Sequence, residues 1–431
     1  MKVLIIGNGG REHALAWKTA QAQNTQVFVA PGNAGTALEP NLTNVNISAT
    51  DIPGLVKFAQ DNAIDLAIVG PEAPLVLGVV DAFTAAGLKC FGPTKGAAQL
   101  EGSKAFSKDF LAKHAIPTAE YQVFTEVDPA LAYIAQKGTP IVIKADGLAA
   151  GKGVIIAQNS AEAEAAIKDM LAGNKFGAAG SRVVVEEFLT GEEASFIVMA
   201  DGVNALAMAT SQDHKARDNG DLGPNTGGMG AYSPAPVVTR AIHDRVMAEV
   251  IYPTIRGMAA DGLPYTGFLY AGLMIDAAGN PKVLEFNCRF GDPETQPIMM
   301  RLQSNLADLC LAALDQKLDS VKVEWDSRPA LGVVIAAGGY PNDYATGHVI
   351  SGLEAAAQIP NAKVFHAGTQ LNANNEVTTN GGRVLCATSL GENVADAQAH
   401  AYAVVDKLSW QDHFYRTDIG YRAVAREQQS E

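Results

Sequence analysis

An apolar stretch that begins at Val283 carries a carboxylate and an amide close to its end. The stretch predicts a buried strand, in which Glu285 and Asn287 share one face while Leu284 and Phe286 occupy the other. Two oxygen donors on one face suit Mg2+, which usually takes one or two protein ligands and completes its shell with water and substrate phosphates. The pair therefore indicates a nucleotide site, and a strand whose polar residues simply meet solvent is the alternative.

The chain continues from this strand as Arg-Phe-Gly-Asp-Pro-Glu-Thr-Gln over residues 289–296. This continuation resembles the signature of the phosphoribosylamine–glycine ligase family of the ATP-grasp superfamily, and further resemblance runs along almost the whole chain. The resemblance implies ATP as a cofactor, with Mg2+ or Mn2+. It implies metal binding by Glu285 and Asn287, a catalytic cation at Arg289 that also contacts substrate, and catalytic positioning by Asp292 and Glu294.

Composition and charge exclude several classes of protein. A chain of 431 residues is long enough for several domains, and no uninterrupted apolar run approaches the roughly 20 residues that span a bilayer. The net charge of -14, without a local run of Lys or Arg, argues against a nucleic-acid surface. The 4 cysteines form no Cys-x-x-Cys pair, so neither a zinc site nor a disulfide framework is indicated. The apolar start is too short for a signal peptide, so a cytoplasmic location is expected.

The amino-terminal residues predict a strand, a glycine turn and a helix. Residues 2–6 are apolar, glycines follow at positions 7, 9 and 10, and a helical pattern begins near Ala14. Such a turn can direct backbone N–H groups and the positive end of a helix at a phosphate, and a purely structural turn is the alternative. NAD is disfavoured, because no acidic residue follows the second strand at residues 27–30 to hold a ribose.

Further alternation of strands and helices predicts a parallel sheet covered on both faces. The loops at residues 8–10, 31–35 and 71–75 follow the carboxyl ends of its strands and are expected to converge on one crevice. The resemblance implies that this crevice helps to bind phosphoribosylamine. The expected contacts are Gly9, Gly10, Arg11, Glu12, Pro71 and Glu72.

A smaller module follows, in which strand 141–144 ends at Lys144 and leads into a glycine-rich loop. A lysine and several N–H groups can surround phosphates there, although the spacing is not that of a P-loop and a plain hairpin is the alternative. The resemblance implies that Lys104 and Lys144 contact phosphates and that a loop with Gly151 and Gly153 folds over ATP. It also assigns Glu186, Phe188 and Leu189 to adenine and Glu193 to ribose.

The segment 211–232 is long, polar and rich in glycine, which is typical of a functional loop. The resemblance places Asp213 and the glycine loop with Gly228 at the substrate site. Ala216 separates Lys215 from Arg217 where the family commonly has a basic pair, so the role of either residue stays open. Residues 270–274 offer no third acidic metal ligand.

Taken together, the patterns and the resemblance predict an α/β and α+β multidomain fold. Residues 1–103 are expected to form a parallel α/β domain of the pre-ATP-grasp type. Residues 104–327 are expected to form the ATP-grasp region, with a small lid subdomain over about 122–190. Residues 328–431 are expected to form a small mixed α/β domain that packs against the amino-terminal crevice without chemistry of its own.

The reaction that the resemblance implies joins glycine to 5-phospho-D-ribosylamine, with ATP giving ADP and phosphate, through glycyl phosphate in de novo purine synthesis. The expected partners are these two small molecules, with no nucleic acid and no membrane. A transient contact with the enzyme that supplies phosphoribosylamine is compatible with this reaction. Another carboxylate–amine ligase or carboxylase, or a nucleotide sensor without turnover, is the alternative, and substrate-dependent ADP release separates them.

Overall fold

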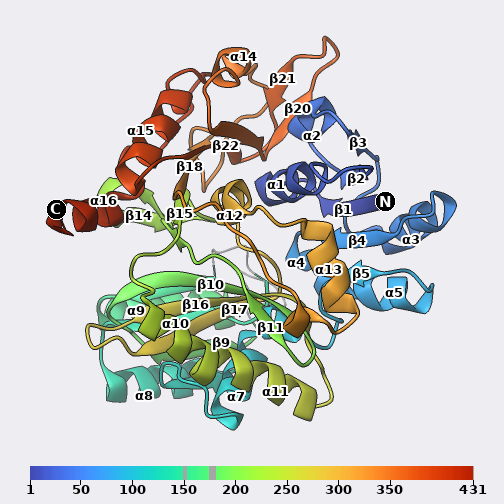
Figure 1. Cartoon of the computed structure of the whole chain (residues 1–431). Coiled ribbons are helices and arrows are strands. Elements are labelled where there is room, and N and C mark those ends of the chain that lie inside the picture. Colours follow the sequence, from blue (N-terminus) through green and yellow to red (C-terminus); the bar gives the residue numbers. More distant parts are fainter. Residues whose placement is uncertain (149–152, 174–180, 431) are drawn as a thin grey trace.

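The computed structural model describes residues 1–148, 153–173 and 181–430. Figure 1 shows the amino-terminal segment in blue, the central segment in green and yellow, and the carboxy-terminal segment in orange and red. Helix α12 (Thr295–Arg301) lies between them and contacts α1, β15, β18 and β22. Among the described helices, none is both long and apolar enough to cross a membrane.

The amino-terminal domain is a five-stranded sheet in the order β3-β2-β1-β4-β5, and all of its strand pairs are parallel. The apolar run of β1 is buried because helices cover both faces of the sheet, as predicted. The strands are β1 (Lys2–Gly7), β2 (Gln26–Pro31), β3 (Leu42–Asn44), β4 (Leu66–Val69) and β5 (Cys90–Phe91). The helices are α1 (Gly10–Thr19), α2 (Ala34–Leu38), α3 (Ile52–Asp61), α4 (Glu72–Leu77), α5 (Val79–Ala85) and α6 (Gln99–Gly102).

The central domain is an antiparallel sheet in the order β11-β10-β16-β17. One apolar core joins this sheet to the amino-terminal domain, with Ile6 and Phe83 on one side and Leu269 and Phe286 on the other. The strands are β10 (Glu192–Asp201), β11 (Ala205–Ala207), β16 (Thr266–Ile275) and β17 (Pro281–Asn287). The helices are α7 (Lys104–Lys113), α10 (Arg240–Val246), η4 (Met247–Ile251), α11 (Tyr252–Ala260), α13 (Leu306–Leu314) and η5 (Leu318–Ser320).

Strand β17 differs from the predicted simple alternation. The register with β16 shifts so that Gly272 pairs with Glu285 and Leu273 pairs with Val283, which makes Leu284 the additional residue of a β-bulge. Val283 and Phe286 therefore both reach the core, while Leu284 is half-buried. The prediction that Leu284 packs with Phe286 on the apolar face was wrong for this reason.

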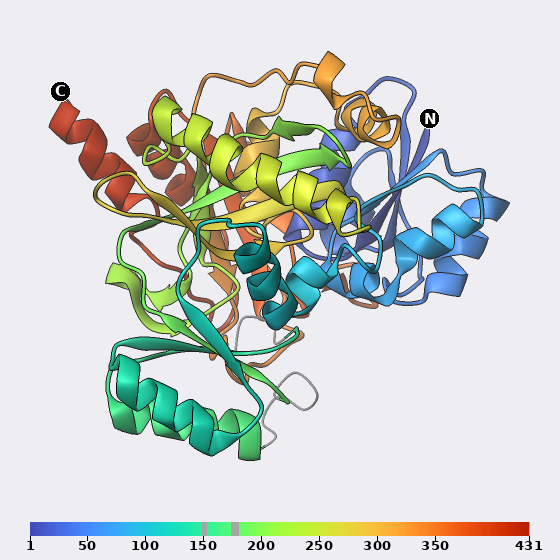
Figure 2. The ribbon, with the colours of Figure 1, turned by 90° about the horizontal axis from the view of Figure 1, so that it is seen from below.

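The lid is a separate four-stranded sheet in the order β6-β9-β7-β8 with its own apolar core. Figure 2 shows this module standing out from the rest of the molecule. Its strands are β6 (Tyr121–Phe124), β7 (Ile141–Ala145), β8 (Val154–Ala157) and β9 (Val183–Glu187), and its helices are α8 (Val127–Lys137), α9 (Ser160–Ile167) and η1 (Lys168–Ala172).

The carboxy-terminal sheet has the order β12-β15-β18-β22-β19, and two of its strands come from the central part of the sequence. β12 (Gln212–Asp213) and β15 (Gly230–Ser233) extend the sheet of β18 (Ala330–Ala336), β22 (Arg383–Leu390) and β19 (Ala362–His366). The remaining elements are β13 (Ala216–Asp218), η3 (Asn219–Asp221), β14 (Leu222–Asn225), β20 (Thr369–Leu371), β21 (Val377–Thr379), α14 (Leu353–Ala356), α15 (Val394–Val405) and α16 (Tyr421–Ser430). The segment that carries Asp213 is therefore anchored in the carboxy-terminal sheet.

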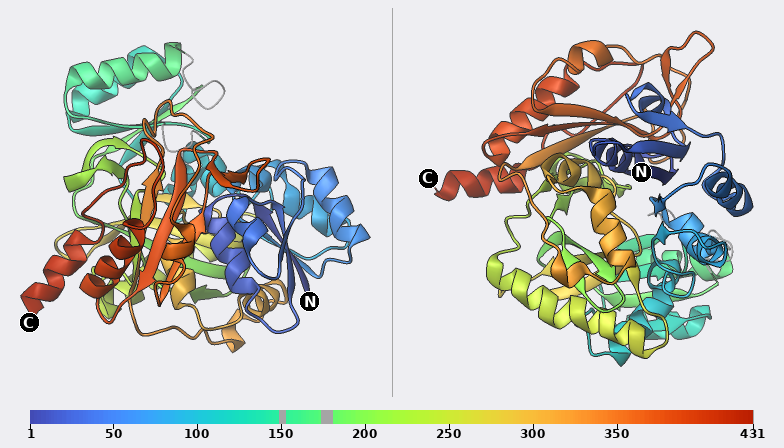
Figure 3. Two further views of the ribbon diagram at one scale, coloured as in Figure 1. Left: turned by 90° about the horizontal axis from the view of Figure 1, so that it is seen from above. Right: turned by 45° about the vertical axis from the view of Figure 1, so that its right-hand side comes forward.

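The carboxy-terminal domain packs on the amino-terminal loops, as predicted, and both views in Figure 3 show the two segments side by side. The side-chain Nδ2 of Asn33 donates to the carbonyls of Asn8 at 2.9 Å and His366 at 2.8 Å. The backbone N–H of His366 donates to Nδ1 of His13 at 2.8 Å. The strand that ends at His366 therefore fixes two of the loops at the carboxyl edge of the parallel sheet.

Candidate active site

A cavity of about 600 Å³ lies where all the domains meet, and its lining comes from each of them. Most of the predicted site residues line it, from segments far apart in the sequence. These are Arg11, Pro71, Glu72, Lys104, Lys144, Gly153, Glu186, Phe188, Leu189, Glu193, Asp213, Glu285, Asn287, Arg289, Asp292 and Glu294. Gly151 lies outside the described residues.

The part of the cavity beside the lid holds two buried lysines around one carboxylate. Lys144 at the end of β7 and Lys108 on α7 form ion pairs with the two oxygens of Glu186 on β9. Lys144 also donates to the carbonyl of Leu284 at 3.1 Å, which connects the lid to the bulge in β17. Burial favours the neutral carboxyl, but the two lysines hold the pKa of Glu186 below its usual value. The cations outnumber the carboxylate, so this part can accept further anionic groups.

Lys104 lies one helical turn before Lys108 on α7, and its Nζ donates to the carbonyl of Gly147 at 3.0 Å. Burial lowers the pKa of Lys104, and the nearby Lys144 adds to this effect while Glu285 opposes it. Lys108 was not predicted from the sequence. Its spacing from Lys104 is the signal that could have found it.

Glu285 and Asn287 present the oxygen donors that the sequence predicts for a metal. Nδ2 of Asn287 donates to Glu101 at 2.9 Å, which leaves its amide oxygen as the atom that can face a cation. Burial disfavours the charged form of Glu285, but Lys215 and Lys144 hold the pKa of this carboxyl below its usual value. Among the described residues, no group of three or more His, Cys, Asp or Glu side chains could hold a metal ion. The two donors fit Mg2+ or Mn2+ that takes its remaining ligands from phosphates and water.

Arg289 is held between carboxylates of two different segments. Its Nη2 lies 2.9 Å from Glu101 Oε1, and its Nε lies 3.4 Å from Glu72 Oε2. Burial favours the neutral guanidine, but Glu101 and Glu72 hold the pKa of Arg289 above its usual value. The cation therefore lies between the amino-terminal crevice and the end of strand β17.

Asp292 is held by a residue of the carboxy-terminal domain. Nη1 of Arg383 donates to the carbonyls of Asp292 at 2.8 Å and Gly227 at 2.9 Å, while its Nη2 lies 3.4 Å from the Asp292 carboxylate. Gln296 donates to the same carboxylate at 3.0 Å. Arg383 also lines the cavity, so this domain contributes a cation that was not predicted.

Several acidic residues gather around Lys215. Nζ of Lys215 lies 3.0 Å from Glu193, and Glu294 accepts a hydrogen bond from Ser195 at 2.9 Å. Burial, together with the carboxylates of Glu294 and Glu193, raises the pKa of Asp213 to about 8, although Lys215 opposes this shift. Lys215 lines the cavity, whereas Arg217 lies outside its lining and pairs with Asp218 at 2.9 Å.

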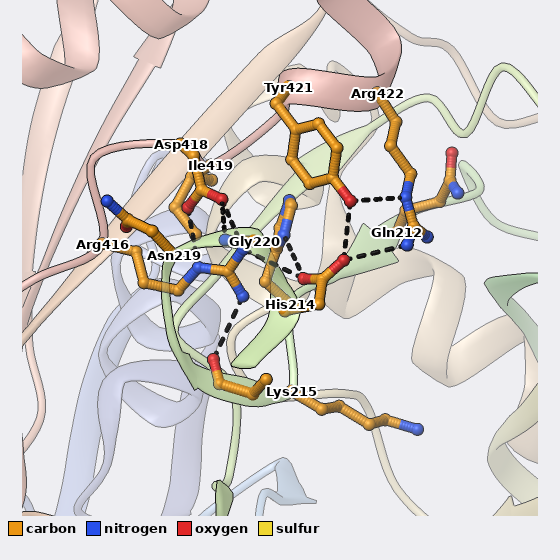
Figure 4. Close-up of polar contacts among 12 residues, drawn as sticks. Gln212, His214, Lys215, Asn219, Gly220, Arg416, Asp418, Ile419, Tyr421 and Arg422 are labelled. Atoms are coloured by element: carbon orange, nitrogen blue, oxygen red, sulfur yellow. Dashed lines mark hydrogen bonds and ion pairs between the residues drawn. The ribbon is translucent and has the colours of Figure 1, made fainter. Parts of the chain in front are cut away.

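The backbone that follows Lys215 is held by the carboxy-terminal segment, as Figure 4 shows. The buried Arg416 donates to the carbonyl of Ala216 at 3.1 Å and lies 3.0 Å from Asp221. Nε2 of His214 accepts from the backbone N–H of Gly420 at 3.0 Å. The side chain of Lys215 extends away from this network, whose contacts are made by the residues on either side of it.

The glycine turn after β1 packs closely around the side chain of Glu12. The N–H of Gly9 donates to Glu12 at 2.7 Å, and a Cβ atom at Gly70 would lie 2.0 Å from Oε1 of Glu12. The carboxylate of Glu12 therefore packs beneath the turn. A Cβ atom at Gly10 would lie 2.5 Å from Nε2 of Gln296, so this glycine allows α12 to approach.

Gly228, like Gly10, allows another segment to approach closely. Its φ of 119° and a Cβ position 2.5 Å from Cδ of Pro293 both require glycine. Four predicted substrate contacts, all of them described residues, are absent from the cavity lining. These are Gly9, Gly10, Glu12 and Gly228.

The parallel amino-terminal domain, the antiparallel central sheet and the separate lid sheet enclose one cavity with buried lysines and a Glu–Asn pair. This architecture defines the chain as an ATP-grasp protein. Sequence models of the three domains of phosphoribosylglycinamide synthetase match it, the N domain over residues 1–101, the ATP-grasp (A) domain over 102–295 and the C domain over 330–422. The chain belongs to the phosphoribosylglycinamide synthetase family.

Individual proteins agree with this assignment. The chain is 70% identical to the phosphoribosylamine–glycine ligase of Salmonella typhi over 429 residues, which are 99% of this chain and 100% of the relative. A crystal structure of phosphoribosylamine–glycine ligase from Thermotoga maritima has a TM-score of 0.83 and 33% identity, and the match covers 97% of this chain and 100% of that one. The biotin carboxylase domain of Hydrogenobacter thermophilus 2-oxoglutarate carboxylase, solved with MgADP, shares the fold with a TM-score of 0.71 at 14% identity, over 96% of this chain and 91% of that one.

Proposed function

We propose that this chain uses ATP to join glycine to 5-phospho-D-ribosylamine, giving glycinamide ribonucleotide, ADP and phosphate in purine biosynthesis. The observation that carries the proposal is that the family signature at residues 289–296 opens onto the same cavity as the buried lysines of the lid. Family membership over nearly the whole chain and the names of its relatives support the same reaction.

The lid side of the cavity would bind ATP, with its phosphates near Lys104 and Lys144 and its adenine against apolar side chains of the β9 end. The proposed contacts are Lys104, Lys144, Gly151, Gly153, Glu186, Phe188, Leu189 and Glu193. Glu186 would act mainly through the lysines, because both of its carboxylate oxygens are already paired.

Glu285 and Asn287 would hold Mg2+ or Mn2+, whose positive charge would neutralise the phosphates of ATP. The carboxylate is ionised and the amide is oriented by Glu101, so both donors suit a hard cation.

A carboxylate is a poor acyl donor, so the first proposed step activates glycine. A carboxylate oxygen of glycine attacks the terminal phosphorus of ATP, and the bond to ADP breaks, which gives glycyl phosphate and ADP. The nitrogen of phosphoribosylamine then attacks the carbonyl carbon, phosphate leaves and the nitrogen loses a proton.

Arg289 would stabilise the negative oxygen of the tetrahedral state, which forms when the nitrogen attacks the carbonyl carbon and ends when phosphate leaves. Asp292 and Glu294 would orient the amino groups of the substrates, and Arg11, Pro71, Glu72 and Asp213 would complete the substrate site. Gly9, Gly10, Glu12 and Gly228 would shape the loops around it. Positioning and charge neutralisation would supply most of the rate enhancement.

Two measurements test this proposal. ADP release should require glycine and phosphoribosylamine together for full rate, whereas a nucleotide sensor would release none and another ligase would prefer a different amine. Glycine labelled with heavy oxygen in its carboxylate should pass one labelled atom to the released phosphate. Unlabelled phosphate would rule out glycyl phosphate.

The metal assignment has its own test. Replacing Glu285 by Gln removes one charged donor and should lower turnover by at least about tenfold, which corresponds to about 1.4 kcal/mol. Unchanged turnover at saturating Mg2+ would contradict the assignment.

All 4 cysteines are buried free thiols, which agrees with the proposed cytoplasmic location.

A further inference from the structure

Glu101 on α6 contacts three consecutive residues that end or follow strand β17, through hydrogen bonds from Asn287 and Cys288 and an ion pair with Arg289. Its Oε1 accepts from Nδ2 of Asn287 at 2.9 Å and lies 2.9 Å from Nη2 of Arg289. Its Oε2 accepts from the backbone N–H of Cys288 at 2.7 Å and from the thiol of the same residue at 3.1 Å. The side chain is buried, with 8% of its surface exposed, so these protein groups surround nearly all of it.

We propose that Glu101 is a positioning residue, which holds the amide of Asn287 and the guanidinium of Arg289 in one fixed arrangement. The inference rests on the proposed function, in which the first group holds the metal and the second faces the reacting carbonyl. An amide can present either its oxygen or its nitrogen to a cation. The bond from Nδ2 to Glu101 directs the oxygen of Asn287 away from Glu101 and thereby selects the orientation that can bind metal.

The same carboxylate determines where Arg289 lies. The guanidinium has a second carboxylate within reach, because Glu72 in the amino-terminal domain lies 3.4 Å from its Nε. Without Glu101, the ion pair with Glu72 would remain and would favour a position of the cation nearer the amino-terminal crevice. Two carboxylates on different segments keep it between the crevice and the strand that carries the metal donors.

Another buried carboxylate shows what a purely structural role looks like in this fold. Asp201 is fully buried at the β10–β11 turn and accepts from the backbone N–H groups of Val203 at 3.0 Å, Asn204 at 2.6 Å and Leu318 at 3.2 Å. These donors lie outside the cavity lining. Glu101, in contrast, accepts a hydrogen bond from Asn287 and pairs with Arg289, both of which line the cavity, so its loss should change catalysis more than its burial alone implies.

The test replaces Glu101 by Gln in the full-length enzyme. This change places an amide NH2, which is a donor, where a carboxylate oxygen now accepts hydrogen bonds. The expected result is a fall in kcat of about 100-fold, because small misplacements of reacting groups have effects of this size. The KM for ATP should change by less than about threefold, since the lysines of the nucleotide site are untouched. Mn2+ affinity, measured by electron paramagnetic resonance with a non-hydrolysable ATP analogue, should weaken by about tenfold.

Asp201→Asn is the matched control, because it removes an equally buried carboxylate and should lower thermal stability while kcat stays within about twofold. If Glu101→Gln does not fold, Glu101→Asp keeps the charge and withdraws the oxygens by one methylene, with the same expected pattern. A kcat within about twofold of wild type, or Mn2+ affinity unchanged, would overturn the proposal. If the wild-type enzyme makes no glycinamide ribonucleotide, the proposed function fails, and the Mn2+ titration alone then decides the role of Glu101.

Discussion

The two sides of the cavity carry opposite excesses of charge. On the nucleotide side, defined by Lys108, Lys144 and Glu186, two cations share one carboxylate. On the substrate side, Lys215 interacts with Asp213, Glu285 and Glu193, the last of which is also the proposed ribose contact, and Glu294 acts on Asp213. The first arrangement suits phosphates, and the second suits a metal ion and the amino groups of the substrates.

The pKa directions of the carboxyl groups express the same difference. Burial favours the neutral carboxyl on both sides. The lysines around Glu186 outweigh it and lower the pKa of that group, whereas burial, together with the carboxylates of Glu294 and Glu193, raises the pKa of Asp213 to about 8 against the opposing effect of Lys215. Local partners, rather than the net charge of -14, therefore decide which ligand each side can accept.

The largest effect is expected where the two sides meet, at Arg289. Replacement by Lys keeps the charge but loses the planar fork that reaches Glu72 and Glu101. Loss of a donor to a developing oxyanion should lower kcat by about 100- to 1,000-fold. Arg301→Lys is the control, since this buried arginine donates to backbone carbonyls outside the cavity lining and should retain turnover. A fall smaller than about tenfold would mean that any cation suffices there.

The nucleotide side should respond next most strongly, to Glu186→Gln. This change leaves Lys108 and Lys144 buried without their carboxylate, and breaking a buried ion pair lowers the free energy of unfolding by about 3 kcal/mol or more. Urea unfolding measures the loss. Glu187→Gln is the matched control, because its pair with Lys282 spans 3.7 Å between exposed side chains and should contribute less than about 1 kcal/mol. Equal free energies of unfolding for the two variants would show that the buried pairs of Glu186 contribute no more to stability than the exposed pair of Glu187.

The stability that Asp213 contributes on the substrate side should depend on pH in the opposite direction from the stability that Glu186 contributes on the nucleotide side. The pKa of Asp213 is about 8 in the folded protein against 3.8 as the ordinary value, so between these values the folded state holds a proton that the unfolded state has released. Its contribution to stability therefore falls as pH rises through this window, by up to about 1.4 kcal/mol per pH unit. Glu186, whose pKa is lowered, contributes stability above its ordinary value of 4.5 and loses it as pH falls below that value.

Asp213→Asn isolates this dependence, because an amide cannot titrate. Unfolding by urea at several pH values between about 5 and 8 should show that the variant gains stability relative to wild type as pH rises. Parallel curves for the two proteins would show that Asp213 is already ionised in the folded state.

The smallest effect is expected at Arg217, one of the two basic residues whose role the sequence left open. Its partner is the neighbouring Asp218, and both side chains are partly exposed outside the cavity lining. Arg217→Met should change kcat by less than about twofold, whereas Lys215→Met should lower it by at least about tenfold. A similar fall in kcat in both variants would place Arg217 at the substrate and would extend the substrate side beyond the cavity lining.

Prediction from the sequence succeeded where a short segment carries both its structure and its chemistry. The apolar run of β1 predicts a buried parallel strand, and Lys144, next to the last residue of β7, reaches the cavity that lies beside the end of that strand. It failed where a contact joins distant segments. Glu101 and Asn287 are 186 positions apart, and Arg383 and Asp292 are 91 apart, so no local pattern marks either pair.

The sequence by itself determined the parallel amino-terminal sheet, and the family motifs in it indicated many of the side chains that line the cavity, because periodicity and motifs are local properties of a chain. Tertiary structure decided how those side chains are used. The bulge at Leu284, the burial of Glu12 beneath its turn and the extension of the carboxy-terminal sheet by β12 all depend on packing between distant segments. The charge state of Asp213 also depends on this packing. Its burial and the neighbouring carboxylates that raise its pKa exist only once the domains have come together.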